Sequence, residues 1–84
     1  MPKTLRSESS YGPGSQQALR RNNMELLILR LSSEGPATQR KLAERTNLSP
    51  ATVSNLVGIL KSQGRVQTTF TTSSGRRAIL VSLS

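Results

Sequence analysis

The 84-residue sequence contains no cysteine, no histidine and no tryptophan. Without cysteine the chain can form no disulfide, and without cysteine or histidine it lacks the usual ligands of a zinc site and the usual thiol or imidazole of a catalytic centre. Its four carboxylates are spaced too widely along the chain to suggest an acid–base pair: Glu8, Glu25, Glu34 and Glu44. We therefore expect a protein that is not an enzyme and that binds no metal and no cofactor.

Long apolar runs are also missing. The first 14 residues, MPKTLRSESSYGPG, contain no apolar stretch of the kind that a secretory signal needs. The longest apolar stretch, LLILRL, is interrupted by Arg30 and is much shorter than the roughly 20 residues that cross a bilayer. These absences predict a soluble cytoplasmic protein that does not bind membranes.

Acidic residues are scarce beside basic ones. Twelve Lys and Arg against four Asp and Glu give a formal net charge of +8. An excess of this size is typical of a protein that binds phosphate or an anionic surface, and it predicts association with the nucleoid. Residues 35–84 contain seven basic residues and a single acidic one, Glu44.

The composition and periodicity of the chain divide it into an arm and one domain. Residues 1–14 are rich in Ser, Gly and Pro and predict a flexible N-terminal arm. Residues 15–84 predict a single domain that begins with a helix over 15–33, because apolar residues recur there at the i, i+3, i+4, i+7 spacing. Those residues are Met24, Leu27, Ile28 and Leu31. Gly35 and Pro36 are expected to end this helix.

Two shorter helices and two strands follow. A helix over 38–46 has Thr38 as a candidate N-cap, and a third begins at Pro50 behind the N-cap Ser49 and ends near Gly64. Alternating apolar residues then predict antiparallel strands over 66–71 and 79–83, joined by the basic loop SSGRR at 73–77 with Gly75 in the turn. This order of elements predicts a mainly α winged helix-turn-helix fold, with three helices and a two-stranded wing.

The third helix is unusual because its outer face has only small side chains. Val53, Leu56, Val57 and Leu60 are expected in the core. This leaves Ala51, Asn55, Gly58 and Ser62 on the opposite side, with Thr52, Ser54 and Ile59 on the flanks. A slim face of Ser, Thr, Asn and Ala suits a helix that enters the major groove of DNA. The alternative is a solvated face that is merely small. Solvated faces, however, are usually rich in Lys, Glu and Gln.

The stretches "GPATQRKLAERTNLSPATVSNLVGILKSQGRV" and "SSGRRAILVSL" resemble the N-terminal winged helix of ROK-family transcriptional repressors and, more distantly, that of MarR-type regulators. The resemblance covers about residues 20–83 and implies a DNA-binding homodimer. It implies that Ser49, Pro50, Ala51, Thr52, Ser54 and Asn55 open the recognition helix, and that Gly75, Arg76 and Arg77 lie in the wing. ROK repressors also contain a sugar-kinase-like domain that has no counterpart in these 84 residues, so we expect no sugar sensing by this chain.

The sequence therefore predicts a regulator, and most simply a repressor, that reads duplex DNA with the helix at about 50–63 and contacts the backbone or minor groove with the wing at 73–77. To the residues named above we add Thr38, Gln39, Arg40 and Lys61 as predicted DNA contacts. Two other functions remain open: a winged helix that docks onto a protein, and an architectural protein that coats DNA without reading its sequence.

A second apolar stripe on the first helix is left unexplained by the core. Leu19, Leu26 and Leu29 cluster on the side of the helix away from Met24 and Leu27. Either other parts of the chain cover this stripe, or it pairs with its copy in a homodimer, since exposed apolar patches usually mark contacts.

Overall fold

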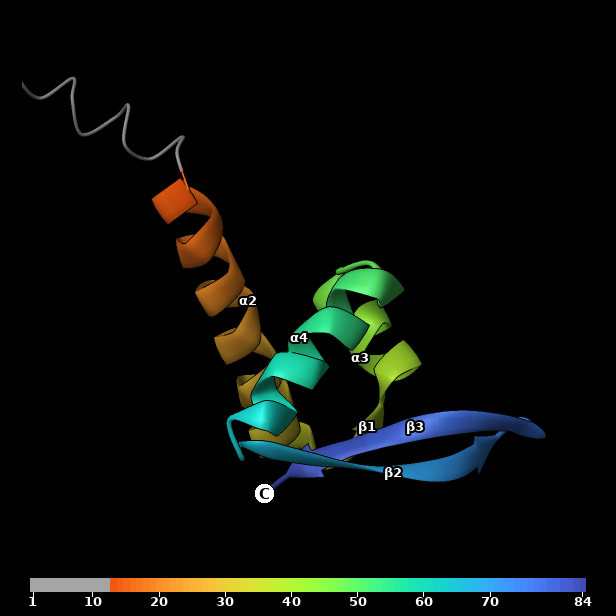
Figure 1. The fold of residues 1–84 in the computed structure, drawn as a ribbon. Helices are drawn as coiled ribbons and strands as arrows, with labels where there is room; N and C mark the ends of the chain where they lie inside the picture. Colours follow the sequence, from red (N-terminus) through yellow and green to blue (C-terminus); the bar gives the residue numbers. More distant parts are fainter. Residues whose placement is uncertain (1–12) are drawn as a thin grey trace, which may run out of the picture.

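The computed structural model describes residues 13–84, which form three helices and one three-stranded antiparallel sheet (Figure 1). Along the chain these elements are α2 (Pro13–Glu34), β1 (Ala37–Thr38), α3 (Gln39–Thr46), α4 (Pro50–Ser62), β2 (Val66–Ser73) and β3 (Arg76–Leu83). The predicted winged helix-turn-helix is thereby confirmed. Of the predicted arm, residues 1–12 lie outside the described residues, and Pro13 already belongs to α2.

Helix α2 begins two residues earlier and ends one residue later than the apolar pattern indicated. Met24, Leu27 and Leu31 are buried, whereas every residue from Gln16 to Asn22 is exposed. The first turns of α2 therefore project beyond the core (Figure 1). Gly35 ends the helix with a φ of +85° and donates its N–H to the carbonyl of Leu31 at 2.9 Å, as a glycine after the last turn commonly does.

Helices α3 and α4 start at the two predicted caps. The hydroxyl oxygen of Thr38 accepts a hydrogen bond from the backbone N–H of Lys41 at 3.1 Å, and that of Ser49 accepts one from the N–H of Thr52 at 3.1 Å. Between the helices Asn47 takes a left-handed conformation with a φ of 62°. Because side-chain capping satisfies N–H groups that have no partner within the helix, both boundaries are determined locally.

The sheet has the order β1–β3–β2, with β3 in the centre. Strands β2 and β3 pair from Val66 opposite Leu83 to Ser73 opposite Arg76, and the turn residues Ser74 and Gly75 both have positive φ, 54° and 78°. Two consecutive positive φ values are the mark of a tight type I′ hairpin. The predicted loop at 73–77 is therefore shorter than expected, since Arg76 and the residue after it already belong to β3.

Strand β1 was not predicted. Its two residues, Ala37 and Thr38, pair with Val81 and Leu80 of β3. A two-residue segment is too short to show an alternating pattern, so only its partner strand reveals it.

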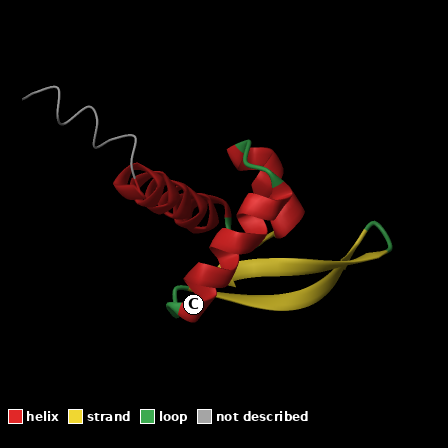
Figure 2. Ribbon diagram, turned by 45° about the horizontal axis from the view of Figure 1, so that its top comes forward, coloured by secondary structure: helices red, strands yellow, loops and turns green. Residues whose placement is uncertain are grey.

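One apolar core joins these elements, and every helix and strand contributes to it. No polar or charged residue of the described chain is buried. The buried residues are Met24, Leu27, Leu31, Ala37, Leu42, Ala43, Val53, Leu56, Val57, Leu60, Val66 and Val81. The helices cover only the base of the hairpin, and its outer half extends beyond them (Figure 2).

No helix within residues 13–84 has both the length and the apolar character required to span a membrane.

Candidate nucleic-acid interface

The outer face of α4 is exposed along the whole helix. We call this face the α4 ridge and define it as Ala51, Ser54, Asn55, Gly58 and Ser62, all of which are exposed. On the other side of the helix four apolar side chains are at most 2% exposed: Val53, Leu56, Val57 and Leu60. A Cβ atom added at Gly58 would meet nothing within 4 Å. The ridge is thus a slim, uncharged surface that is not packed against the rest of the protein.

At the start of α4 two predicted site residues are occupied in capping. The Ser49 hydroxyl donates to the Thr52 hydroxyl oxygen at 2.8 Å and also accepts the N–H of Thr52, while Pro50 fills the first helical position. Ser49 is exposed and Thr52 is half-buried. Their primary role is therefore to begin the helix sharply, which places Ala51 at the front of the α4 ridge.

The N-terminal half of α2 lies beside one edge of the α4 ridge. Thr52 and Asn55 share a shallow hollow of about 170 Å³ with Leu19, Arg20 and Asn23. The sequence contained no signal for this neighbourhood, because the relative placement of α2 and α4 depends on how both helices pack on the core. Arg20 and Asn23 are thus candidate interface residues that were not predicted.

A second hollow, of about 700 Å³, separates the N-terminus of α3 from the outer half of the hairpin. Thr38, Gln39 and Arg40 line one side, and Arg76 and Arg77 line the other. The structure thereby brings together two groups of predicted site residues that are far apart in the sequence. Lys61, also predicted, is exposed near the C-terminus of α4, at the other end of the helix from Ser49.

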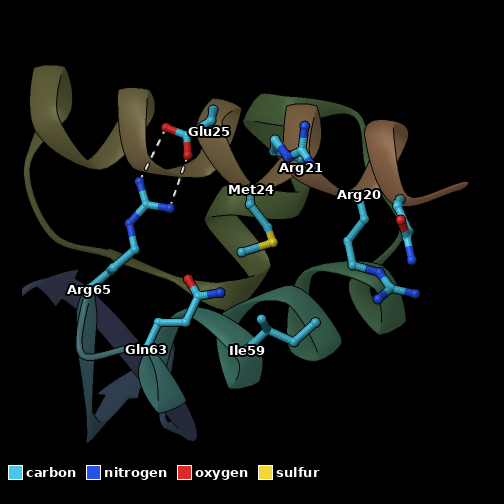
Figure 3. Close-up of a pocket in the computed structure, with 8 residues that line it drawn as sticks. Arg20, Arg21, Met24, Glu25, Ile59, Gln63 and Arg65 are labelled. Atoms are coloured by element: carbon cyan, nitrogen blue, oxygen red, sulfur yellow. Dashed lines mark hydrogen bonds and ion pairs between the residues drawn. The ribbon is translucent and has the colours of Figure 1, made fainter. Parts of the chain in front are cut away.

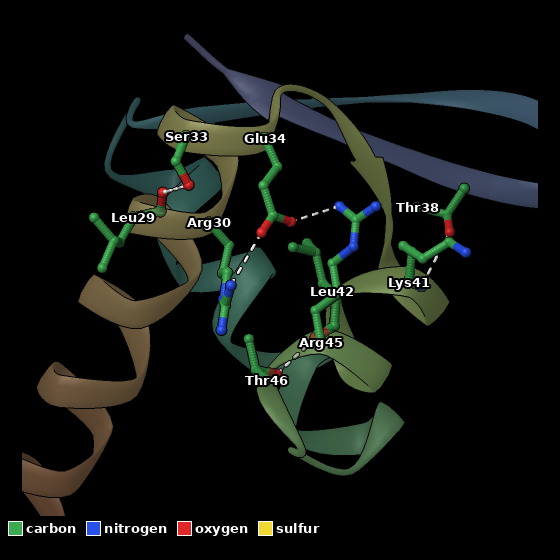
Figure 4. A network of polar contacts seen from close by, with 9 residues as sticks. All are labelled: Leu29, Arg30, Ser33, Glu34, Thr38, Lys41, Leu42, Arg45 and Thr46. Atoms are coloured by element: carbon green, nitrogen blue, oxygen red, sulfur yellow. Dashed lines mark hydrogen bonds and ion pairs between the residues drawn. The ribbon is translucent and has the colours of Figure 1, made fainter.

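Carboxylates neutralise the arginines that lie against the helices. Glu34 accepts ion pairs from Arg45 at 2.8 Å and from Arg30 at 3.0 Å, which ties the end of α2 to α3 (Figure 4). Glu25 pairs with Arg65 at 2.9 Å, which ties α2 to the residue just before β2 (Figure 3). These pairs hold the helices and the sheet together rather than facing a ligand.

The hydrogen bond from Arg65 and, to a smaller degree, its positive charge lower the pKa of Glu25, against an opposing effect of desolvation. The same hydrogen bond raises the pKa of Arg65, which stays charged at any physiological pH. This pair borders a hollow of about 480 Å³ between α2 and α4.

The remaining positive charge lies on α2, on α3, at the end of α4 and in the wing. Six basic residues within 13–84 form no ion pair: Arg20, Arg21, Lys41, Lys61, Arg76 and Arg77. Arg40 has only a long contact of 3.8 Å with Glu44, and its side chain is 83% exposed. The charges available to an anionic ligand therefore flank the second hollow, the C-terminal end of α4 and the N-terminal half of α2. The described residues include no cluster of three or more His, Cys, Asp or Glu side chains that could hold a metal ion.

Comparison with known proteins finds similarity to transcriptional regulators. A family model described as MarR family matches residues 22–77. A probable transcriptional regulator from Pseudomonas aeruginosa superposes with a TM-score of 0.65 and 34% identity, over 73% of this chain and 46% of that one. NMB1585, a MarR family regulator from Neisseria meningitidis, superposes with a TM-score of 0.62 and 29% identity, over 74% of this chain and 43% of that one.

The fold also occurs in a protein of more similar length. Stf76 from the Sulfolobus islandicus plasmid-virus pSSVx superposes with a TM-score of 0.66 over 73% of this chain and 79% of that one, and its 24% identity supports a shared fold alone. The chain spans less than half the length of the Pseudomonas and Neisseria regulators. No curated protein matches the sequence.

Proposed function

The chain belongs to the MarR family, and on that premise we propose that it is a repressor that binds a specific sequence of duplex DNA as a homodimer. The observation that carries this proposal is the exposed α4 ridge. The major groove is about 12 Å wide and admits an α-helix, but only if the leading face of the helix leaves the base edges within reach. The small side chains of the ridge meet that condition, and the fold is that of solved transcriptional regulators.

The α4 ridge supplies the sequence-reading contacts in this proposal. The amide of Asn55 can pair with an adenine edge, the Ser54 hydroxyl can donate or accept at a base edge, and the Ala51 methyl can pack on a thymine methyl. Ser49, Pro50 and Thr52 form the helix start that aims these side chains, and the N-terminus of α4 favours a backbone phosphate next to it.

The residues around the hollow between α3 and the wing supply the contacts with DNA that do not depend on its sequence. Arg40, Arg76 and Arg77 border the hollow in which Thr38 and Gln39 begin α3. Arginine binds phosphate well and is attracted to the negative potential of a narrow minor groove. The tight turn at Gly75 presents the wing arginines beside the DNA, and Lys61 adds a backbone contact at the far end of α4.

A second copy of the chain is proposed to cover the apolar stripe on α2. Leu19 and Leu29 are 61% and 62% exposed, so no described part of the chain covers them. Together with Asn22, Leu26 and Ser33 they recur at alternating spacings of three and four residues, which is the heptad spacing of paired helices. A two-fold dimer that places two recognition helices about 34 Å apart requires an inverted-repeat operator.

The experiment that tests sequence-specific binding is selection of duplexes from a randomised library, followed by fluorescence anisotropy. The titrations compare the selected duplex with a scrambled duplex of the same base composition, at several salt concentrations. We expect the selected duplex to bind at least about 1,000-fold more tightly than the scrambled one. Equal binding of the two duplexes would favour the architectural alternative, and binding that is weak and insensitive to salt would favour docking onto a protein.

Repression is tested separately with a reporter gene. The selected sequence is placed across a promoter, and expression is measured with the wild-type protein and with a variant whose α4 ridge carries Asn55→Ala. A repressor lowers expression from this promoter and has no effect on a promoter with the scrambled sequence. Higher expression from this promoter would contradict the repressor role. The resemblance to ROK repressors stays a prediction.

A further inference from the structure

We propose that Phe70 is a positioning residue, whose ring holds the guanidinium of Arg77 on the side of the wing that faces the helices. This inference rests on the proposed function, because it assigns Phe70 an effect on DNA binding that passes through Arg77. Phe70 was not among the predicted site residues. It is one of only two aromatic residues in the chain.

The register of the hairpin places Phe70 and Arg77 on the same face. Every second residue of β2 points to one face of the hairpin: Val66, Thr68, Phe70 and Thr72. Their partners on β3 point to the same face and are, in the same order, Leu83, Val81, Ile79 and Arg77. Because Val66 and Val81 are buried, this face is the one turned toward the helices. Phe70 and Arg77 are diagonal neighbours on it, close enough for long side chains to touch.

Phe70 has no packing role that explains its presence. Its side chain is 71% exposed, and its cross-strand partner Ile79 is the last apolar residue of this face that packs against the core. The guanidinium carbon of Arg77 lies 5.0 Å from the centre of the Phe70 ring. That distance is within the range of a cation–π contact, which is attractive even at an exposed site.

This contact distinguishes the two wing arginines. Arg76 pairs with Ser73 across the turn and belongs to the opposite face of the hairpin, and within residues 13–84 no aromatic ring lies beneath it. A free arginine side chain loses much rotamer freedom when it binds a phosphate, and a side chain held in advance loses less. Arg77 is therefore oriented before DNA arrives, and Phe70 is the residue that orients it.

The test is a double-mutant cycle on the full 84-residue chain, measured by anisotropy with the selected duplex. The variants are Phe70→Leu, Arg77→Gln and the two combined. We expect Phe70→Leu to weaken binding about two- to fivefold, the range that an exposed cation–π contact supports, and to have no effect once Arg77 is replaced. Phe70→Tyr and Phe70→Trp, which keep a ring, are expected to bind as the wild type does.

A matched control and the salt dependence separate positioning from a direct contact. Phe70→Leu is expected to weaken binding equally in the wild type and beside Arg76→Gln, since Arg76 lies on the other face. Arg77→Gln removes a charge and is expected to reduce the salt slope by about 0.9, whereas Phe70→Leu removes none and is expected to leave the slope unchanged. If Phe70→Leu weakens binding to the same extent with and without Arg77, the ring itself contacts DNA or supports the fold, and the proposal is wrong.

The positioning itself can be measured without DNA. In the free protein, the ring current of Phe70 is expected to shift the side-chain NMR signals of Arg77 upfield, and Phe70→Leu is expected to remove that shift. Unshifted Arg77 signals in the wild type would overturn the proposal. If these signals are shifted but the selected and scrambled duplexes bind equally, the proposed sequence-specific function fails while the ring contact stands.

Discussion

Gly58 provides a test in which stability and DNA binding should change in opposite directions. It lies in the middle of α4, on the exposed α4 ridge, and an added Cβ would meet nothing within 4 Å. Glycine inside a helix is less stable than alanine by about 0.5 to 1 kcal/mol, because it loses more backbone entropy on folding. Gly58→Ala should therefore raise the free energy of unfolding by that amount. For a domain of this size the increase corresponds to roughly 2 to 8 °C in Tm.

Gly58→Gln should also fold stably, since glutamine is a good helix former and the site is open to solvent. Its side chain, however, would project from the ridge into the groove and hold the helix away from the base edges. Each specific base pairing that the helix can then no longer make costs about 1 to 3 kcal/mol of binding free energy. We expect Gly58→Gln to bind the selected duplex at least about tenfold more weakly, and Gly58→Ala to bind it much as the wild type does.

Thermal unfolding by circular dichroism gives the stability, and fluorescence anisotropy gives the affinity. Ser32→Gln is a matched control, because Ser32 is an exposed position near the end of α2 outside the proposed interface. It should leave DNA binding unchanged. If Gly58→Gln is well folded and binds the selected duplex with wild-type affinity, the α4 ridge does not enter the major groove and the reasoning from its shape is wrong.

Three further predictions concern the base contacts, the dimer and the ion pair between Glu25 of α2 and Arg65. Asn55→Ala should reduce discrimination at one or two base pairs by about 1 to 3 kcal/mol each, measured by anisotropy with single-substitution operators; an equal loss on all of them would contradict base reading. Leu19→Ser combined with Leu29→Ser should convert dimer to monomer in sedimentation velocity and leave the fold intact, because both side chains are exposed; an unchanged dimer would place the interface elsewhere. The lowered pKa of Glu25 means that its pair with Arg65 stabilises the fold at neutral pH, and that this contribution is lost as the pH falls from the ordinary carboxyl value of about 4.5 through the lowered pKa. Glu25→Gln should therefore lower Tm more at about pH 7 than near pH 3, and the same change in Tm at both values would refute the linkage.

The local elements of this fold follow from short stretches of sequence. Ser49 followed by Pro50 determines where α4 starts, because the cap and the first helical position need no information from elsewhere in the chain. The turn at Gly75 and the alternating residues on either side of it likewise predict the hairpin. The chemistry of the α4 ridge was also readable, since the positions of Ala51 and Asn55 opposite the apolar residues follow from the helical period alone.

Other features could not be predicted, because they depend on residues that meet only in three dimensions. Strand β1 exists because β3 is there to pair with it. Arg45 and Arg65 are as basic in the sequence as the wing arginines, yet Glu34 and Glu25 neutralise them across helix contacts. The contact between Phe70 and Arg77 depends on strand register, which decides which side chains share a face.

The sequence by itself therefore determined the order of the three helices and the two hairpin strands, the caps that begin α3 and α4, and the small side chains of the α4 ridge. These features depend on interactions between residues a few positions apart. Only the tertiary structure decided which positive charges stay available and that Arg77 lies over Phe70. Ion pairs and cross-strand contacts join residues that are distant along the chain, and the packing of the core brings them together.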